Sequence, residues 1–446
     1  MIRLVVSDLG WHAREWVGIL VVTIAAGFVG AIAAGLLETG ASNGGDVQVA
    51  MIGGSGVVLT FSSVTALIVL SSSANLTVTL QQRSYALWQL AGIRPRQVGR
   101  VVLGQLVVVG ILGAVSGSIL ARALFRSVFE FAFADWQGMS GLPLHLGAAS
   151  VGCVVVAVVG TIVLGGLRGV RRASRVAPIE ALREPEPPSV RLTWFRMLLA
   201  AATATGIVWM ALAMNSGDFD LIMNSSIFVT PMIAALIAAL GPVLFSLVLR
   251  AWTACVPSRA SAAWYLARHS AAHRLSRSTA AISPLMVAVA LTGGLYTTVA
   301  VLKQSFIERT GDASGFGIEF ASVVLMLGGP LLLSGIAAAA TVFISSHARE
   351  REFALVQAAG STRRTIVWMS VFEAVIYAIT ATILGLVAIV SGGIITVLAL
   401  ELNTLPISFA SVSLVAAGGL ALLLVATLVP TLAALRTEIP RTLAVE

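Results

Sequence analysis

Charged residues are scarce in this chain of 446 residues. Asp, Glu, Lys and Arg together make up 11% of the sequence, whereas 58% is hydrophobic, and the mean hydropathy is +0.96. A soluble domain carries about a quarter charged residues. The composition therefore excludes an ordinary soluble protein and indicates a polytopic membrane protein.

Lysine is almost absent, since Lys303 is the only one. A phosphate-binding P-loop has the pattern G-x-x-x-x-G-K-[ST], in which the lysine neutralises nucleotide phosphates. Gln304 follows Lys303, so the sequence contains no such loop. We therefore expect this chain to hold no cofactor and to have no ATPase activity of its own.

Cysteine and histidine are also rare. Cys153 falls within an apolar run and Cys255 in a connection, so we predict two unpaired packing residues. His269 and His273 are four residues apart, but they alternate with arginines, which favours the polar face of a surface helix. With neither a third ligand nor a nucleophile constellation, the sequence predicts no metal site and no catalytic site.

Long apolar runs make up most of the chain. A helix needs roughly 20 residues to cross about 30 Å of hydrocarbon, and ten runs approach or exceed this length. They cover residues 16–37, 53–79, 101–125, 144–167, 196–214, 227–249, 281–302, 322–345, 366–398 and 409–433. The sequence therefore predicts an all-α membrane protein with about ten transmembrane helices and both termini on one side.

The basic residues show which side that is. Apart from Arg122, Arg126, Lys303 and Arg309, they all lie in the termini and in every second connection. By the positive-inside rule this side is cytoplasmic. The net charge of +8 therefore reflects topology, and we expect a bacterial cytoplasmic (inner) membrane protein with no nucleic-acid partner.

A repeat organises the chain. Residues 81–100 read QQRSYALWQLAGIRPRQVGR, and residues 349–368, 268 positions later, read REREFALVQAAGSTRRTIVW. We predict a first repeat at residues 1–190, which starts with a surface helix, then two linking transmembrane helices at 191–253, and a second repeat at 254–446. Two linking helices keep the repeats parallel rather than inverted.

Each copy of the repeated segment carries an apolar face at helical spacing and then a glycine, which is typical of a helix stop. These residues are Leu87, Leu90, Ala91 and Gly92 in the first copy, and Leu355, Ala358, Ala359 and Gly360 in the second. A single copy would be interpreted as a helix lying on lipid headgroups. Two copies favour docking elements for two identical cytoplasmic partners.

The second copy resembles the FtsX-like and MacB-like permeases of ABC transporters. Their cytoplasmic motif has the form REFALLRALGASRRQI, which residues 351–355, 359–361, 363, 364 and 366 match, and Glu373 stands where the family has a glutamate in the following span. The first copy departs from the motif, with Ser84 in place of the acid, Tyr85 in place of the phenylalanine and Gln105 in place of the glutamate.

This resemblance implies a permease subunit. Residues 87–92 and 355–360 would be coupling elements that seat on two copies of a separate ATPase, which would bind ATP and magnesium. The complex would export or extract an amphipathic or hydrophobic substrate, such as a peptide, lipid or drug, with antimicrobial resistance as the expected context.

The predicted outer connections are too short to hold a folded domain. The large outer domain of MacB-like proteins is therefore absent, and we do not expect direct delivery to a periplasmic partner. The alternative function is mechanotransmission, in which the complex regulates an extracytoplasmic partner without transport. A secondary transporter is disfavoured because the repeats are parallel and coupling acids are scarce.

Three polar residues within spans are further candidates. Glu373 is either functional or an interfacial acid paired with arginines such as Arg364, and we favour the second interpretation. Gln105 in the matching position favours a hydrogen-bonding role that needs no charge. Arg122, near an outer end, either snorkels to the surface or attracts an anionic headgroup or peptide.

Small residues also recur within the third span. Gly110, Gly113 and Gly117 lie about one turn apart. Because glycine lets helix backbones approach closely, this spacing predicts a packing seam.

Overall fold

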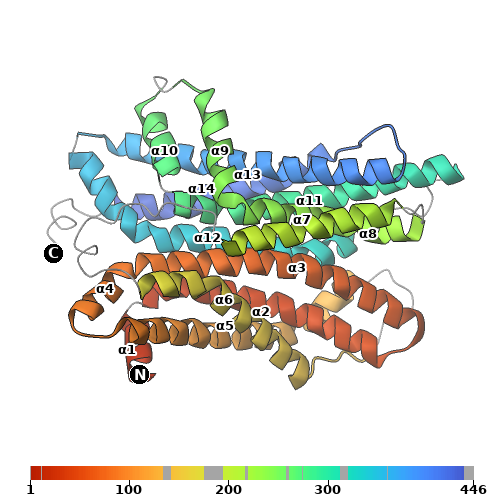
Figure 1. Cartoon of the computed structure of the whole chain (residues 1–446), viewed down its shortest axis with the longest axis horizontal. Helices are drawn as coiled ribbons and strands as arrows, with labels where there is room; N and C mark the ends of the chain where they lie inside the picture. Colours follow the sequence, from red (N-terminus) through yellow and green to blue (C-terminus); the bar gives the residue numbers. More distant parts are fainter. Residues whose placement is uncertain are drawn as a thin grey trace. The chain divides into compact units, whose positions relative to one another are not determined.

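The computed structural model describes residues 2–11, 13–133, 142–174, 194–215, 219–257, 261–273, 275–311, 320–358 and 360–435. The secondary-structure elements in these ranges are α-helices (Figure 1). Their bounds are α1 Ile2–Trp11, α2 Ala13–Ser42, α3 Gly45–Leu80, α4 Gln82–Leu90, α5 Pro95–Ala132, α6 Ala148–Ala173, α7 Trp194–Met214, α8 Phe219–Ala239, α9 Gly241–Ala254, α10 Ala262–His273, α11 Leu275–Thr310, α12 Phe320–Ala358, α13 Arg363–Ala399 and α14 Phe409–Ala434. The predicted all-α class is confirmed.

Ten helices in the described part of the chain are long and apolar enough to cross a membrane. The spans are Trp16–Ser42, Met51–Thr79, Pro95–Ala132, Ala148–Leu167, Arg196–Met214, Leu221–Ala239, Ser278–Arg309, Ser322–Thr341, Arg363–Ala399 and Phe409–Ala433. Each corresponds to one predicted run. The longest helix, α12, has 39 residues and at 1.5 Å per residue is about 58 Å long, so it must extend beyond about 30 Å of hydrocarbon or tilt within it.

The sixth span differs from the prediction. We predicted one continuous run at 227–249, but α8 ends at Ala239 and α9 begins at Gly241. Pro242 lies at the start of α9. Proline has no N–H to donate, and its ring clashes with the carbonyl four residues earlier, which favours a helix start here. Proline does not end every helix of this chain, since Pro231 and Pro284 lie inside α8 and α11. The span therefore lies earlier in the chain, at Leu221–Ala239.

The helices pack into two compact units. Unit 1 comprises Met1–Glu186 and Ile318–Ala340, and unit 2 comprises Pro187–Gly317 and Thr341–Glu446. The two units therefore do not coincide with the two sequence repeats, because the first part of α12 packs in unit 1. The predicted domain boundaries follow the repeat instead, and the boundary at 190–191 lies outside the described residues.

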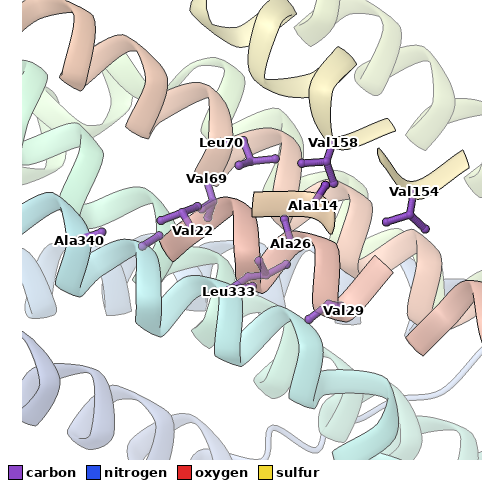
Figure 2. Close-up of a cluster of buried hydrophobic side chains, with 12 residues drawn as sticks. Val22, Ala26, Val29, Val69, Leu70, Ala114, Val154, Val158, Leu333 and Ala340 are labelled. Atoms are coloured by element: carbon purple, nitrogen blue, oxygen red, sulfur yellow. The ribbon is translucent and has the colours of Figure 1, made fainter. Parts of the chain in front are cut away.

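In unit 1, α2 packs against α3, α5 and α6. Figure 2 shows one part of this core, in which Leu333 and Ala340 of α12 face Val22 and Val29 of α2. Small and branched apolar side chains fill this region. The second span of repeat 2 thus contributes apolar side chains to the core of unit 1.

Glycines on α5 bring two neighbouring helices close to it. A Cβ atom added to Gly117 would lie 2.1 Å from the carbonyl oxygen of Ile24 on α2, and one added to Gly113 would lie 1.9 Å from Thr23 Oγ1. Gly110 faces α6 instead, because a Cβ atom added to Gly110 would lie 3.2 Å from a side-chain carbon of Val159. The predicted packing seam is confirmed, and it serves two different neighbours.

In unit 2, α11 packs against α13, α14 and α8, and α7 packs against α8. Thr230 of α8 lies against two glycines, Gly294 of α11 and Gly392 of α13. The linking helices are therefore attached to the helices of the second repeat. α9 is attached too, since Trp252 Nε1 donates a hydrogen bond of 2.9 Å to Thr380 Oγ1 on α13.

The two cysteines are free, as predicted, but both side chains are exposed. The expectation of buried packing residues is therefore wrong. Cys153 lies on the outward face of α6, a span of which little is buried within the protein. Sequence alone could not show which side of this uniformly apolar helix faces its neighbours.

Candidate functional site

The first copy of the repeated segment forms α4, a short helix between two long ones. Tyr85 and Ala86 have no exposed surface, whereas Leu87 and Leu90 are 51% and 52% exposed. Ala91 is exposed as well. The face predicted for docking is therefore the face that α4 leaves uncovered, and the adjacent face holds α4 to the protein.

The second copy forms the last turns of α12, which continues without a break from its span to Ala358. Leu355 is 55% exposed, close to the value for its counterpart Leu87, and Ala358 is also exposed. Ala359 lies outside the described residues. Both copies thus present a leucine, which would be covered only by another molecule or by lipid.

Both helices end in the same way. Gly92 has φ +92° and Gly360 has φ +95°. Gly92 donates its backbone N–H to Gln89 O at 3.1 Å, and the next residue, Ile93, donates to Trp88 O at 3.0 Å. This pair of hydrogen bonds is a Schellman motif, which needs a left-handed residue that only glycine adopts without strain.

The second copy reproduces this cap at equivalent positions. Gly360 donates to Gln357 O at 2.9 Å and Ser361 donates to Val356 O at 3.2 Å. The predicted glycine stops are confirmed. Each stop fixes where the chain leaves the exposed leucines and turns into the following long span.

Gln105 is buried in the span that follows α4, and it joins three helices. Its Nε2 donates a hydrogen bond of 2.6 Å to Asp8 Oδ2 on α1, and its Oε1 lies 3.4 Å from the hydroxyl of Tyr85 on α4. The same hydroxyl donates to Gln81 Oε1. Because a carboxylate only accepts, Asp8 orients the Gln105 amide and leaves its oxygen towards Tyr85. The predicted hydrogen-bonding character of Gln105 agrees with this geometry.

Glu373, which matches Gln105, is 2% exposed. Its Oε1 accepts a hydrogen bond of 2.5 Å from Tyr377, one turn along α13. Ser278, at the start of the first span of repeat 2, donates to the Tyr377 oxygen at 3.3 Å. Glu373 is therefore buried with a tyrosine partner, and the interpretation favoured from the sequence, an interfacial acid paired with arginines such as Arg364, stays a prediction.

Positions 105 and 373 therefore share one arrangement, a buried side-chain oxygen facing a tyrosine hydroxyl. The tyrosines come from different elements, α4 in the first repeat and α13 itself in the second. Sequence reasoning missed Asp8, Tyr377 and Ser278 and gave Tyr85 no role beyond a departure from the motif. The four-residue spacing of Glu373 and Tyr377 on one helix was the available signal.

Arg122 is exposed on α5, near the end away from α4. One turn further along, Arg126 Nε pairs with Glu130 Oε1 at 2.8 Å, and both side chains are mostly exposed. An exposed ion pair of this kind contributes little to stability. The structure does not test the role predicted for Arg122, which stays a prediction.

A second polar site joins helices near this end of unit 1. Glu38 of α2 accepts hydrogen bonds from the backbone N–H of Gly147 at 2.8 Å and from Ser150 Oγ at 2.5 Å. Gly147 directly precedes α6 and Ser150 lies in its first turn. Backbone N–H groups at the start of a helix have no helical partner. Glu38 thus caps α6 from another helix, a structural role that the sequence did not indicate.

Metal binding finds no support within the described residues, which contain no group of three His, Cys, Asp or Glu side chains able to hold an ion. His269 is exposed on α10 and stacks on Tyr265, with ring centroids 4.3 Å apart. The opposite side of α10 buries Ala263, Trp264 and Ala267. The two histidines therefore belong to a polar face, as the sequence indicates.

Comparison with protein families matches the chain twice. The model of the FtsX-like permease C-terminal domain fits residues 56–178 and 324–439, which together make up more than half of the chain. Each match contains one copy of the α4-type segment and the spans around it. No curated protein matches the chain. FtsX-like permeases are multi-pass membrane components of the ABC-transporter type that typically pair with an ATPase. By these two matches, with the ten apolar helices that accompany them, the chain belongs to the FtsX-like permease family.

Proposed function

We propose that this chain is the permease subunit of an ABC transporter in the bacterial cytoplasmic membrane, with both termini inside. Two copies of a separate ATPase subunit, which bind ATP and magnesium, dock at α4 and at the end of α12. Their hydrolysis cycle drives efflux or extraction of an amphipathic or hydrophobic substrate.

The observation that carries this proposal is the duplicated apolar helix end. Leu87 and Leu355 are exposed to nearly the same extent, and each lies five residues before a glycine cap with the same two hydrogen bonds. Lipid contact would not require the same cap geometry twice. Two identical partner subunits, each with one groove, would require the same surface at both places.

The exposed leucines have enough apolar surface to anchor a partner. Full burial of a leucine side chain stabilises a complex by about 1.5–3 kcal/mol, so covering the exposed half of Leu87 is worth about 1 kcal/mol. The same holds for Leu90 and Leu355. An aspartate at any of these positions would instead place an unpaired charge in the groove, which costs more than the lost contact.

The outer connections support a substrate that is handled within the membrane. Asn43 and Gly44 alone join α2 to α3, and residues 400–408 join α13 to α14. Neither can form a substrate-binding domain. We therefore favour a peptide, lipid or drug that partitions into the bilayer, with antimicrobial resistance as the physiological context.

Co-purification with an ABC ATPase from the same organism tests the docking assignment. We expect Leu87→Asp and Leu355→Asp each to reduce recovery of the ATPase, and the double variant to abolish both recovery and stimulated ATP hydrolysis. Tyr265→Asp is the matched control, because Tyr265 is an exposed apolar residue on α10, outside both copies. Unchanged assembly of the double variant would refute the assignment.

Flux measurements decide between transport and signalling. Inverted vesicles that contain the complex should accumulate a hydrophobic peptide or dye when ATP is added. The competing function, mechanotransmission to an extracytoplasmic partner, predicts ATP-dependent activation of that partner without flux of any candidate compound.

A further inference from the structure

The two repeats connect their docking segments to the membrane helices in different ways. In repeat 2 the segment continues its span as one helix, α12. In repeat 1, α3 ends at Leu80, and Gln81 adopts φ −88° and ψ 2° before α4 begins. A continuous helix transmits an axial force directly. Across the interruption Gln81 N–H donates to Thr77 O at 3.3 Å and Tyr85 N–H donates to Gln81 O at 3.1 Å, and side-chain contacts add to this connection.

Tyr85 is the most deeply buried large side chain of α4. Of the α4 side chains whose surroundings are described, Tyr85 and Ala86 are the two that are fully buried. Ala86 reaches no further than its own Cβ atom, whereas Tyr85 packs with Val98, Val102 and other residues of the core at the end of α5. Trp88 packs against the same core from a partly buried position, so Tyr85 is the fully buried anchor of α4.

The hydroxyl of that anchor belongs to a polar cluster that spans three helices. It faces Gln81 Oε1 at the interruption and Gln105 Oε1 on α5, and Gln105 is bound in turn to Asp8 on α1 at 2.6 Å. All four side chains are at least nine-tenths buried. Buried polar groups are costly unless paired, so such a cluster holds its members in one arrangement.

Repeat 2 differs in sequence at the position that matches Tyr85. Position 353, which matches Tyr85, is a phenylalanine without a hydroxyl. The tyrosine that faces Glu373 is Tyr377, which lies on the same helix as Glu373. The cluster occurs in the repeat whose helix is interrupted.

We propose that Asp8, Tyr85 and Gln105 are positioning residues that fix the docking helix of repeat 1 to α1 and α5, and so carry movement at α4 into the membrane span. The proposal rests on the proposed function in one respect, namely that an ATPase docks at α4. The attachment of α4 itself can be measured without any ATPase.

Hydrogen exchange of the full chain in nanodiscs tests the attachment. Tyr85→Phe removes the hydroxyl and keeps the ring, so we expect the amides of residues 85–92 to exchange about two- to tenfold faster, as the loss of one buried hydrogen bond predicts. Tyr377→Phe, the matched control in repeat 2, should leave exchange in α4 unchanged. Equal exchange in wild type and Tyr85→Phe would overturn the proposal.

A second pair of variants swaps the hydrogen-bond donor at position 105 with the acceptor at position 8. It shows whether the effect on α4 comes from this hydrogen bond or from altered packing. Gln105→Glu alone removes the amide donor and leaves Asp8 facing a second carboxyl group in a buried site. We expect exchange in α4 to rise more than in Tyr85→Phe. Adding Asp8→Asn restores a donor to the acceptor at position 105 and should return exchange to within about twofold of wild type, as one recovered hydrogen bond allows. No recovery in the double variant would contradict a specific hydrogen-bonded link.

Addition of the ATPase distinguishes failure of this inference from failure of the proposed function. If the ATPase binds wild type, Tyr85→Phe should retain binding, because Leu87 and Leu90 are unchanged, but should lower transport per ATP hydrolysed. Full transport per ATP with faster α4 exchange would overturn the transmission role. Absence of ATPase binding to wild type would refute the proposed function and leave the exchange result to decide the attachment.

Discussion

Replacement of Gly117 by alanine tests whether the close contact of α2 and α5 holds unit 1 together. The added Cβ would lie 2.1 Å from Ile24 O and 2.6 Å from Phe28 N. These two atoms are four residues apart, so they form one turn of the backbone hydrogen-bond ladder of α2. A backbone cannot rotate out of the way as a side chain can.

The structure sets the size of the effect. Non-bonded carbon atoms settle about 3.5–4.0 Å apart, so α2 and α5 would have to separate locally by more than about 1 Å. Overpacking of this kind costs about 1–3 kcal/mol. Alanine offsets up to about 1 kcal/mol of it through its better helix propensity. We expect a net loss of about 1–2 kcal/mol in the free energy of unfolding.

Unfolding in mild detergent, followed by tryptophan fluorescence during heating or denaturant titration, measures this loss. Gly160→Ala on α6 is the matched control, because a Cβ atom there meets no atom within 4 Å. It should be neutral or slightly stabilising. If Gly117→Ala is as stable as the control, or the control loses as much, then the α2–α5 contact does not determine stability as argued.

Three further predictions concern other parts of the fold. Glu38→Ala should lower the free energy of unfolding by about 1–2 kcal/mol, because it removes the cap of α6, and Glu38→Gln, which still accepts, should lose less. Gly92→Ala and Gly360→Ala should each cost about 1–2 kcal/mol, because alanine is strained at positive φ, although no atom blocks either added Cβ; equal exchange of the neighbouring amides with wild type would contradict this. Trp252→Phe should lower the free energy of unfolding by about 1 kcal/mol, because it removes the partly buried hydrogen bond from α9 to Thr380 on α13. If this bond is the cause, adding Thr380→Val to Trp252→Phe should cause no further loss of stability.

Features that depend on neighbouring residues in the chain were predictable. The ten spans follow from apolar length, and the glycine stops at Gly92 and Gly360 follow from a conformation that other residues avoid. The break before Pro242 was local too, and the Gly-Pro pair was its signal. We missed it because the apolar run continues through it without a charged residue.

The partners of the polar candidates were not predictable. Gln105 is bound to Asp8, 97 residues earlier, and Glu38 caps a helix that begins 110 residues later. Hydropathy carries no information about contacts between residues that are this far apart in the sequence. A buried carboxylate and an exposed one look alike in sequence, so the tyrosine partner of Glu373 was not predicted.

By itself, the sequence determined the class, the number of spans, the duplication and the position of the two copies of the repeated segment. These depend on transfer of side chains to an apolar medium and on backbone geometry, both of which act locally. Only the tertiary structure decided that Leu87 and Leu355 stay uncovered, that α12 contributes to the core of unit 1, and that Tyr85 anchors α4. These depend on which surfaces meet, and in a chain that is apolar almost everywhere, hydrophobicity cannot distinguish a surface that meets protein from one that meets lipid.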